Sequence, residues 1–264
     1  MAVVLTDNKH YTAIADKIRE KTAHSDTMTP AEMSGKIGDV YEAGRFAERF
    51  RRWNTYQQGG NRTNYSNAFR VGWTNDIFDP MFDLTCTNAS AMFSATDIEG
   101  DLVENLNTLG VKLDTSQATN LSSMFYNATK LTRVGIIDAQ KASDITYMFE
   151  SATALKTIDK VILKNDGSQT PNAFKQLKSL EKLTIEGTIG KNGFNAQHST
   201  KLDHDSIVSI INALSTTTTG LSITISLEAV KKAFATSEGA LDGNTSTEWT
   251  TLIGTKSNWT ISLV

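Results

Sequence analysis

The hydrophobic and polar positions of the chain recur in a fixed register around a phenylalanine. Asn or Asp lies five residues before it in four of five copies, Ser or Thr lies three residues before it in four, and Ala or Met directly precedes it in all. The spacings between these phenylalanines are 24, 32, 24 and 25 residues. Such a period is typical of proteins whose units bury an apolar edge by stacking on their neighbours. The register therefore predicts a structural ladder of Phe69, Phe93, Phe125, Phe149 and Phe174.

Apolar residues follow Phe125, Phe149 and Phe174 at every third position. This spacing predicts one or two helical turns after each phenylalanine, which then lead into a short strand. The strands are expected at 134–137, 158–163 and 183–186. Stacking would also let the Asn/Asp and Ser/Thr side chains bond the backbone of successive turns. The alternative is that these are ordinary apolar positions of an α/β domain.

The interval between Phe93 and Phe125 is longer than the others. It predicts an insertion of about one loop near residues 99–108. In repeat proteins such insertions project from one face, which is often the face that binds a partner. The first copy also departs from the pattern, because no leucines follow Phe69, and residues 71–82 are expected to form an irregular cap.

Two helices are predicted before the repeats. Residues 11–18 carry one apolar stripe, and Thr29, Pro30 and Glu32 have the pattern of a helix N-terminus. The second helix would continue to about Tyr56. It either packs on the first repeat as a cap or joins copies of itself or another subunit.

Helices and strands alternate after the repeats. Asp205 and Ser226 are expected to cap two helices, and the segment from Thr245 to Glu248 has the pattern of a capping box. Alternating apolar residues predict strands at 221–225 and 259–263. These strands would add two final rungs to the sheet and cover its open end.

Together these elements predict an α/β repeat fold, namely a leucine-rich-repeat-like solenoid. An N-terminal helical segment at 1–60 would serve attachment or oligomerisation. The repeats would span 61–200, and a C-terminal α/β cap would span 201–264. Terminal caps are needed because an uncovered apolar rung aggregates.

The composition of the chain limits the classes of partner that we expect it to bind. The net charge of −3 gives no electrostatic reason to expect nucleic acid, and no apolar run is long enough to enter and span a bilayer. The first residues lack the basic segment of a secretory signal peptide. Cys86 has no second cysteine to pair with. We therefore expect synthesis in a bacterial cytoplasm without a signal peptide, no membrane insertion and no nucleic acid partner.

Candidate chemistry is sparse. His198, His204 and Asp205 are close in sequence but lack the spacing of known metal motifs. The lone Cys86 shows no histidine partner that would make it a nucleophile. Acidic residues cluster just before and at the start of the predicted insertion, at Asp97, Glu99 and Asp101. A pair of them could serve glycoside hydrolysis, although a solvated loop explains them more simply. We expect no enzyme, no cofactor and no metal.

Several segments resemble known families. Residues 113–131, with Asp-Thr-Ser ahead of Met-Phe, look like the BspA-type leucine-rich repeat, and residues 177–185 are the most leucine-rich copy. Residues 14–33 are similar to the start of many bacteriophage and prophage tail proteins, and residues 237–260 resemble the endings of the same group.

The resemblance implies a virion component of the tail tip or baseplate. Its N-terminal helices would attach to other tail or baseplate proteins and would allow a homotrimer. Its repeats would contact a host-surface protein or glycan for receptor binding. The alternative is a bacterial surface or secreted adhesin. The absence of an export signal favours the virion tail.

The residues that would contact a receptor are predicted from the register itself. Tyr126 and Tyr147 occupy positions at which the repeat does not require an aromatic residue. Trp73 is a third candidate, although a place in the core also suits it. Exposed aromatic and polar residues on one face are typical of repeat proteins that bind partners.

Overall fold

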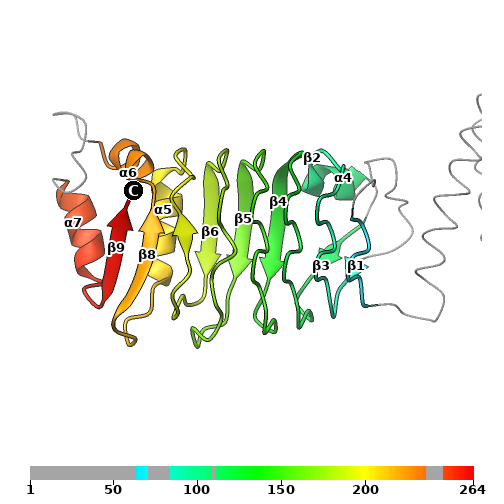
Figure 1. The fold of residues 1–264 in the computed structure, drawn as a ribbon, viewed down its shortest axis with the longest axis horizontal. Coiled ribbons are helices and arrows are strands. Elements are labelled where there is room, and N and C mark those ends of the chain that lie inside the picture. Colours follow the sequence, from blue (N-terminus) through cyan, green and yellow to red (C-terminus); the bar gives the residue numbers. More distant parts are fainter. Residues whose placement is uncertain (1–62, 71–83, 109–110, 236–245) are drawn as a thin grey trace, which may run out of the picture. The chain divides into compact units, whose positions relative to one another are not determined.

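A computed structural model describes residues 63–70, 84–108, 111–235 and 246–264 (Figure 1). The chain divides into two compact units, Met1–Gly60 and Asn61–Val264, and the described residues belong to the second. The predicted N-terminal helices, Trp73, the cap at 71–82 and Thr245 lie outside the described residues.

The described part combines helices with parallel sheets (Figure 1). The largest sheet has four strands, which follow one another in chain order: β2 (Gly100–Asp101), β4 (Leu131–Asp138), β5 (Thr157–Ile162) and β6 (Lys182–Glu186). Two smaller parallel sheets flank it. They consist of β1 (Leu84–Thr85) with β3 (Leu113–Asp114), and of β7 (Asn195–Ala196), β8 (Leu221–Ile225) and β9 (Trp259–Leu263).

The central strands exist because their apolar residues align across the sheet. Val134 of β4 is in register with Ile158 of β5, which is in register with Leu183 of β6, and all three are buried. These strands fall where the sequence places them, and β4 is longer than predicted at both ends. Ile136 departs from the pattern, since 55% of its surface is exposed on β4.

The five phenylalanines of the register are buried and stacked. Successive ring centroids lie 5.2, 5.3, 5.5 and 5.8 Å apart from Phe69 to Phe174. A sixth ring, Phe194, continues the stack 5.2 Å beyond Phe174. The sequence register missed Phe194, because Gly193 precedes it and Ile189 occupies the Asn/Asp position.

The predicted helical turn around each phenylalanine is wrong, and the chain forms a series of tight turns there. Non-glycine residues two positions before or after a phenylalanine have left-handed backbone: Asn67, Ala91, Ala95, Ser123, Asn127, Tyr147, Ser151 and Gln176. A left-handed residue every fourth position prevents an α-helix. The backbone bonds instead to the next repeat, as where the N–H of Phe93 donates to the carbonyl of Met124 (2.7 Å).

The recurrent Asn/Asp side chains hold these turns, but they bond the backbone of their own turn, whereas the stacking predicted bonds to the backbone of successive turns. The side-chain oxygen of Asn120 accepts a hydrogen bond from the N–H of Ser122 (2.9 Å). Asn64, Asn88 and Asp144 make the same contact with the residue two positions on. Each turn is therefore closed by a side chain that mimics a backbone acceptor.

The insertion is a helix and not a loop. Helix α4 (Leu102–Thr108) buries Leu102 and Leu106. Asp101 begins it, because its carboxylate accepts hydrogen bonds from the N–H groups of Val103 (2.8 Å) and Glu104 (3.2 Å). The helix packs on β4 at Gly135, where a Cβ would lie 3.1 Å from the Val103 side chain. The expected solvated loop is thus wrong for Asp101.

Three helices pack at the C-terminal end, α5 (His204–Ala213), α6 (Leu227–Ala233) and α7 (Thr247–Gly254). Asp203 caps α5, not Asp205, since its side chain accepts from the N–H of Ser206. Ser226 caps α6 as predicted. Ser246 caps α7, which moves the capping residue one position from Thr245.

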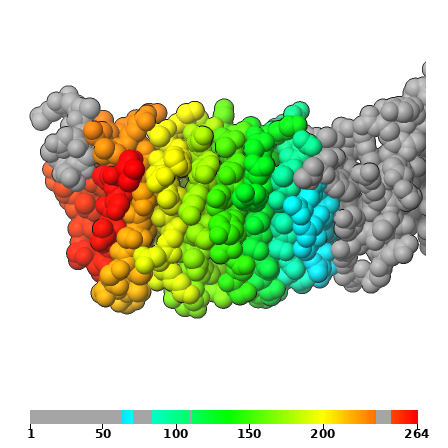
Figure 2. All heavy atoms as spheres, viewed as in Figure 1, coloured from blue at the N-terminus to red at the C-terminus, as the bar shows by residue number. Residues whose placement is uncertain are grey.

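No sharp boundary separates the repeats from the predicted cap at 201–264. Helix α5 packs against β6, and residues on both sides of position 200 belong to the same compact unit. Figure 2 shows the surface running on without a break across this region. Within the described residues, no helix is long and apolar enough to cross a membrane.

Candidate functional site

The predicted cluster of His198, His204 and Asp205 does not assemble as a metal site. His198 contacts the side chain of Gln197, while His204 contacts Glu248 and Asp205. Throughout the part of the chain that the structure describes, no three His, Cys, Asp or Glu residues gather in a way that could hold a metal ion.

Cys86 is placed as a core residue. Its thiol is fully buried, donates weakly to the carbonyl of Leu84 (3.4 Å) and lies 3.9 Å from the sulfur of Met92. Burial, together with the charge of Asp114, raises the pKa of Cys86 to about 12. The thiol is therefore protonated at neutral pH, whereas a nucleophile needs the thiolate.

Two of the three clustered acidic residues are engaged in ion pairs. Asp97 pairs with Lys130 (2.9 Å), and Asp101 pairs with Arg133 (3.1 Å). The Nε and Nη2 atoms of Arg133 also donate hydrogen bonds to the two carboxylate oxygens of Asp159, each over 2.8 Å. Hydrogen bonds to Asp159 and Asp101 raise the pKa of Arg133. These contacts tie α4 and β2 to β4 and β5, which gives the carboxylates a structural role.

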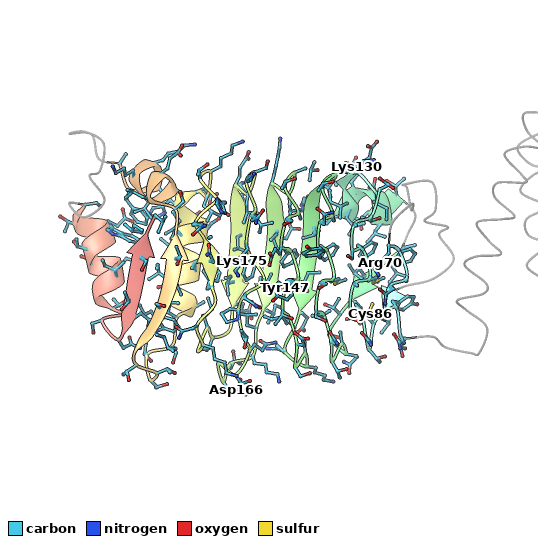
Figure 3. The ribbon with its side chains drawn as sticks, viewed as in Figure 1. Arg70, Cys86, Lys130, Tyr147, Asp166 and Lys175 are labelled. Atoms are coloured by element: carbon cyan, nitrogen blue, oxygen red, sulfur yellow. The ribbon has the colours of Figure 1, made fainter. Side chains whose placement is uncertain are left out.

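Tyr126 and Tyr147 are two of the large apolar side chains that the described surface exposes, by 41% and 45%. Tyr126 directly follows Phe125, and its N–H donates to the carbonyl of Ser123 (3.0 Å). The N–H of Ser123 in turn donates to Thr146 on the next repeat (2.8 Å), directly before Tyr147. These backbone bonds place the two tyrosines on adjacent repeats, diagonal to each other. Figure 3 labels Tyr147 among the side chains of the unit.

Tyr147 has a backbone conformation that is unfavourable for a bulky residue. Its φ is +59°, and the residues at the equivalent left-handed position are Asn67, Ala91 and Ser123. A non-glycine residue held there costs on the order of 1–3 kcal/mol, and Asn tolerates it best. Neither backbone preference nor core packing explains a tyrosine here, since almost half of it faces solvent.

Two polar residues adjoin Tyr147 through the backbone. The N–H of Tyr147 donates to the carbonyl of Asn172 on the next repeat, and the N–H of Glu150 donates to the carbonyl of Tyr147, both at 3.2 Å. Glu150 Oε2 and Asn172 Oδ1 are buried without a hydrogen-bond partner among the described residues. An unsatisfied buried acceptor costs roughly 1–3 kcal/mol. We call Tyr126, Tyr147, Glu150 and Asn172 the tyrosine site.

Sequence reasoning named the two tyrosines and missed the two acceptors. A signal was nevertheless present in the register. Glu150 follows its phenylalanine directly, as Tyr126 does, and Asn172 precedes its phenylalanine by two positions, as Tyr147 does. Extending the tyrosine positions by one repeat would have identified both.

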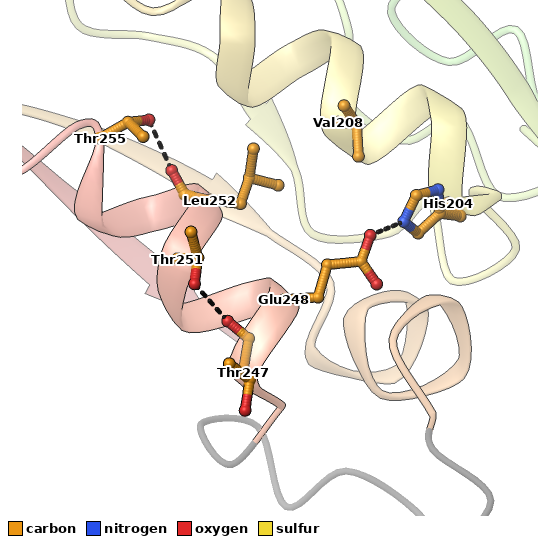
Figure 4. Close-up of a pocket in the computed structure, with 7 residues that line it drawn as sticks. All are labelled: His204, Val208, Thr247, Glu248, Thr251, Leu252 and Thr255. Atoms are coloured by element: carbon orange, nitrogen blue, oxygen red, sulfur yellow. Dashed lines mark hydrogen bonds and ion pairs between the residues drawn. The ribbon is translucent and has the colours of Figure 1, made fainter.

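A shallow groove of about 430 Å³ lies between α5 and α7 (Figure 4). Val208 and Leu252 give it an apolar lining, and His204 bonds Glu248 at one end (2.6 Å). The His204 ring also packs on Phe234, with centroids 4.9 Å apart. Hydrogen bonds to Asp205 and Glu248 raise the pKa of His204. The hydrogen bond between His204 and Glu248 joins α7 to α5.

One known protein family matches the part of the chain that contains most of the repeats. A family model described as "Mycoplasma protein of unknown function, DUF285" matches residues 39–162 and 80–183, which together cover more than half of the chain. The chain belongs to the DUF285 family. This family is associated with BspA-like repeat proteins, which confirms the resemblance at that level. Searches of curated proteins and of solved structures gave no match.

Proposed function

We propose that this DUF285 protein is a non-enzymatic recognition protein whose described unit is a leucine-rich-repeat-like solenoid. The observation that carries this proposal is the exposed, diagonally adjacent pair Tyr126 and Tyr147. The fold does not require an aromatic residue at either position, whereas Tyr is enriched at binding surfaces. Asp97, Asp101 and Cys86, by contrast, have structural contacts that account for them.

The setting we propose is a phage tail, where the protein binds other tail or baseplate proteins and presents the tyrosine site to a host cell. The similarity of residues 14–33 and 237–260 to phage tail proteins supports this setting. Mass spectrometry of purified virions from a lysogen that carries the gene tests it. Virions that contain the chain support the tail, and a chain found on the surface of uninfected cells supports the adhesin alternative.

Recognition itself is tested by binding the labelled full chain to bacteria of the strain that carries the gene. We expect the double substitution Tyr126→Ala and Tyr147→Ala to weaken binding at least about tenfold. Ile136→Ala is the matched control, because Ile136 is also a large exposed apolar residue but lies on β4. If only Ile136→Ala weakens binding, the sheet is the contact surface and the proposal for the tyrosine pair is wrong.

A further inference from the structure

The chemistry around the tyrosine pair narrows the class of ligand, on the basis of the proposed recognition function. Tyr126 and Tyr147 are each a little more than half buried, so their rings are partly held in place before a ligand arrives. A pre-ordered aromatic ring loses little conformational freedom on binding. The two rings therefore offer apolar surface on neighbouring turns.

Two unsatisfied atoms lie on residues that adjoin Tyr147 through the backbone, and both atoms are acceptors. The oxygens of Glu150 and Asn172 lack donors among the described residues, and a ligand that supplies O–H or N–H groups would satisfy them. Both oxygens are buried, so a ligand reaches them only when neighbouring side chains turn aside. New hydrogen bonds to these oxygens would offset the free energy of that opening.

The ligand also has to suit the charges nearby. Lys175 follows Phe174 directly, at the position that Glu150 has in the preceding repeat, and the carbonyl of Lys175 accepts from the N–H of Ser151 (3.1 Å). The carboxylate of Glu150 and the lysine at the equivalent position of the next repeat have opposite charges, and this balance favours a neutral ligand over a charged one. Neutral hydroxyl donors combined with a flat apolar C–H face are the properties of a sugar ring.

We propose that the tyrosine site binds a saccharide of the bacterial surface. The rings of Tyr126 and Tyr147 pack against the C–H face of a sugar, and Glu150 and Asn172 accept hydrogen bonds from its hydroxyl groups. Tyr147 holds its position with a left-handed backbone, and ring contact with a sugar would give that strained conformation a function.

The test measures binding of the full chain to bacteria treated with periodate, which cleaves vicinal diols of sugars, or with trypsin, which removes surface proteins. We expect periodate to abolish binding and trypsin to leave it within about twofold. Saturable binding to the purified cell-surface polysaccharide, by calorimetry or on an array, should accompany this result. Binding that resists periodate and is lost with trypsin, yet still needs the tyrosines, overturns the saccharide and leaves the recognition function intact.

Variants separate the roles within the site. Tyr147→Phe keeps the ring and should bind within about threefold of the wild type, whereas Tyr147→Ala should bind at least about tenfold more weakly. Glu150→Gln exchanges one acceptor oxygen for a donor and should weaken polysaccharide binding about tenfold without lowering the unfolding midpoint. If Glu150→Gln binds the polysaccharide as tightly as the wild type does, the carboxylate of Glu150 is not part of the binding site. If neither tyrosine substitution changes binding to untreated cells, the recognition function fails as well.

Discussion

Replacing Phe125 with alanine removes the third ring of the stack and is the most informative test of what holds the repeats together. Phe125 has no exposed surface, and its ring lies between Phe93 at 5.3 Å and Phe149 at 5.5 Å, within 2° of parallel to both. Phe→Ala in a core costs about 3–5 kcal/mol from lost transfer free energy and the residual cavity. Two well-placed ring contacts favour the upper half of that range. We expect the free energy of unfolding to fall by about 4–5 kcal/mol.

Urea denaturation of the full chain, followed by far-UV circular dichroism, measures this loss. Phe125→Leu is the matched variant, because it refills much of the volume without restoring the ring contacts, and it should cost about 1.5–3 kcal/mol. Tyr126→Ala, on the adjacent exposed residue, should cost less than about 1 kcal/mol. A loss below about 1.5 kcal/mol for Phe125→Ala, or an equal loss for the leucine variant, would refute the stacking argument.

Other contacts lead to three further predictions. Hydrogen bonds to Asp205 and Glu248 raise the pKa of His204, so their stabilising effect is fully present below about pH 6.5 and is lost as the pH rises through the higher pKa of the folded state. Unfolding free energies measured from pH 5 to 8 should show this decline, and Glu248→Gln should flatten it; an equal slope in both proteins would contradict the contact. Cys86, whose pKa burial raises to about 12, should react with an aromatic disulfide reagent at neutral pH only as fast as the protein opens, and immediate labelling would show an accessible thiol. Gly187 has φ +91°, and a Cβ there would collide with the backbone carbonyl of Leu163. Gly187→Ala should therefore lower the unfolding free energy by about 1–3 kcal/mol or more in the same urea assay. An unchanged midpoint would show that the backbone can shift to make room.

Sequence reasoning located the parts of the fold that depend on repetition. The phenylalanine register and the positions of β4, β5 and β6 could be predicted because the same few residues recur at one spacing, and each copy reinforces the others. Phe194 was missed for the same reason, since its copy lacks the flanking residues while the packed ring remains.

The errors concern backbone conformation and the competition between neighbouring groups. Left-handed residues such as Ser123 and Asn127 are not glycines, so the tight turns leave little trace in the sequence. Asp203 and Asp205 both flank the start of α5, and only the position of Ser206 decides that Asp203 is the cap. The seven residues of α4 are too few for periodicity to separate a helix from a loop.

The tyrosine site could be predicted in part. Tyr126 and Tyr147 stand out because the register requires no aromatic residue at their positions, and the structure exposes both. The unsatisfied oxygens of Glu150 and Asn172 depend on which neighbouring side chains enclose them, and that arrangement follows from packing across repeats. The register identifies the positions of Glu150 and Asn172, but it does not show that their oxygens are buried without a partner.

Binding of the full chain to host cells, compared between the wild type and the double substitution at Tyr126 and Tyr147, tests the central claim most directly. The unfolding free energy of both proteins is measured alongside. We predict binding at least about tenfold weaker with the stability lowered by no more than about 1 kcal/mol per substitution. Equal binding by the two proteins, or a loss of binding that follows unfolding of the variant, would contradict recognition through the tyrosine site.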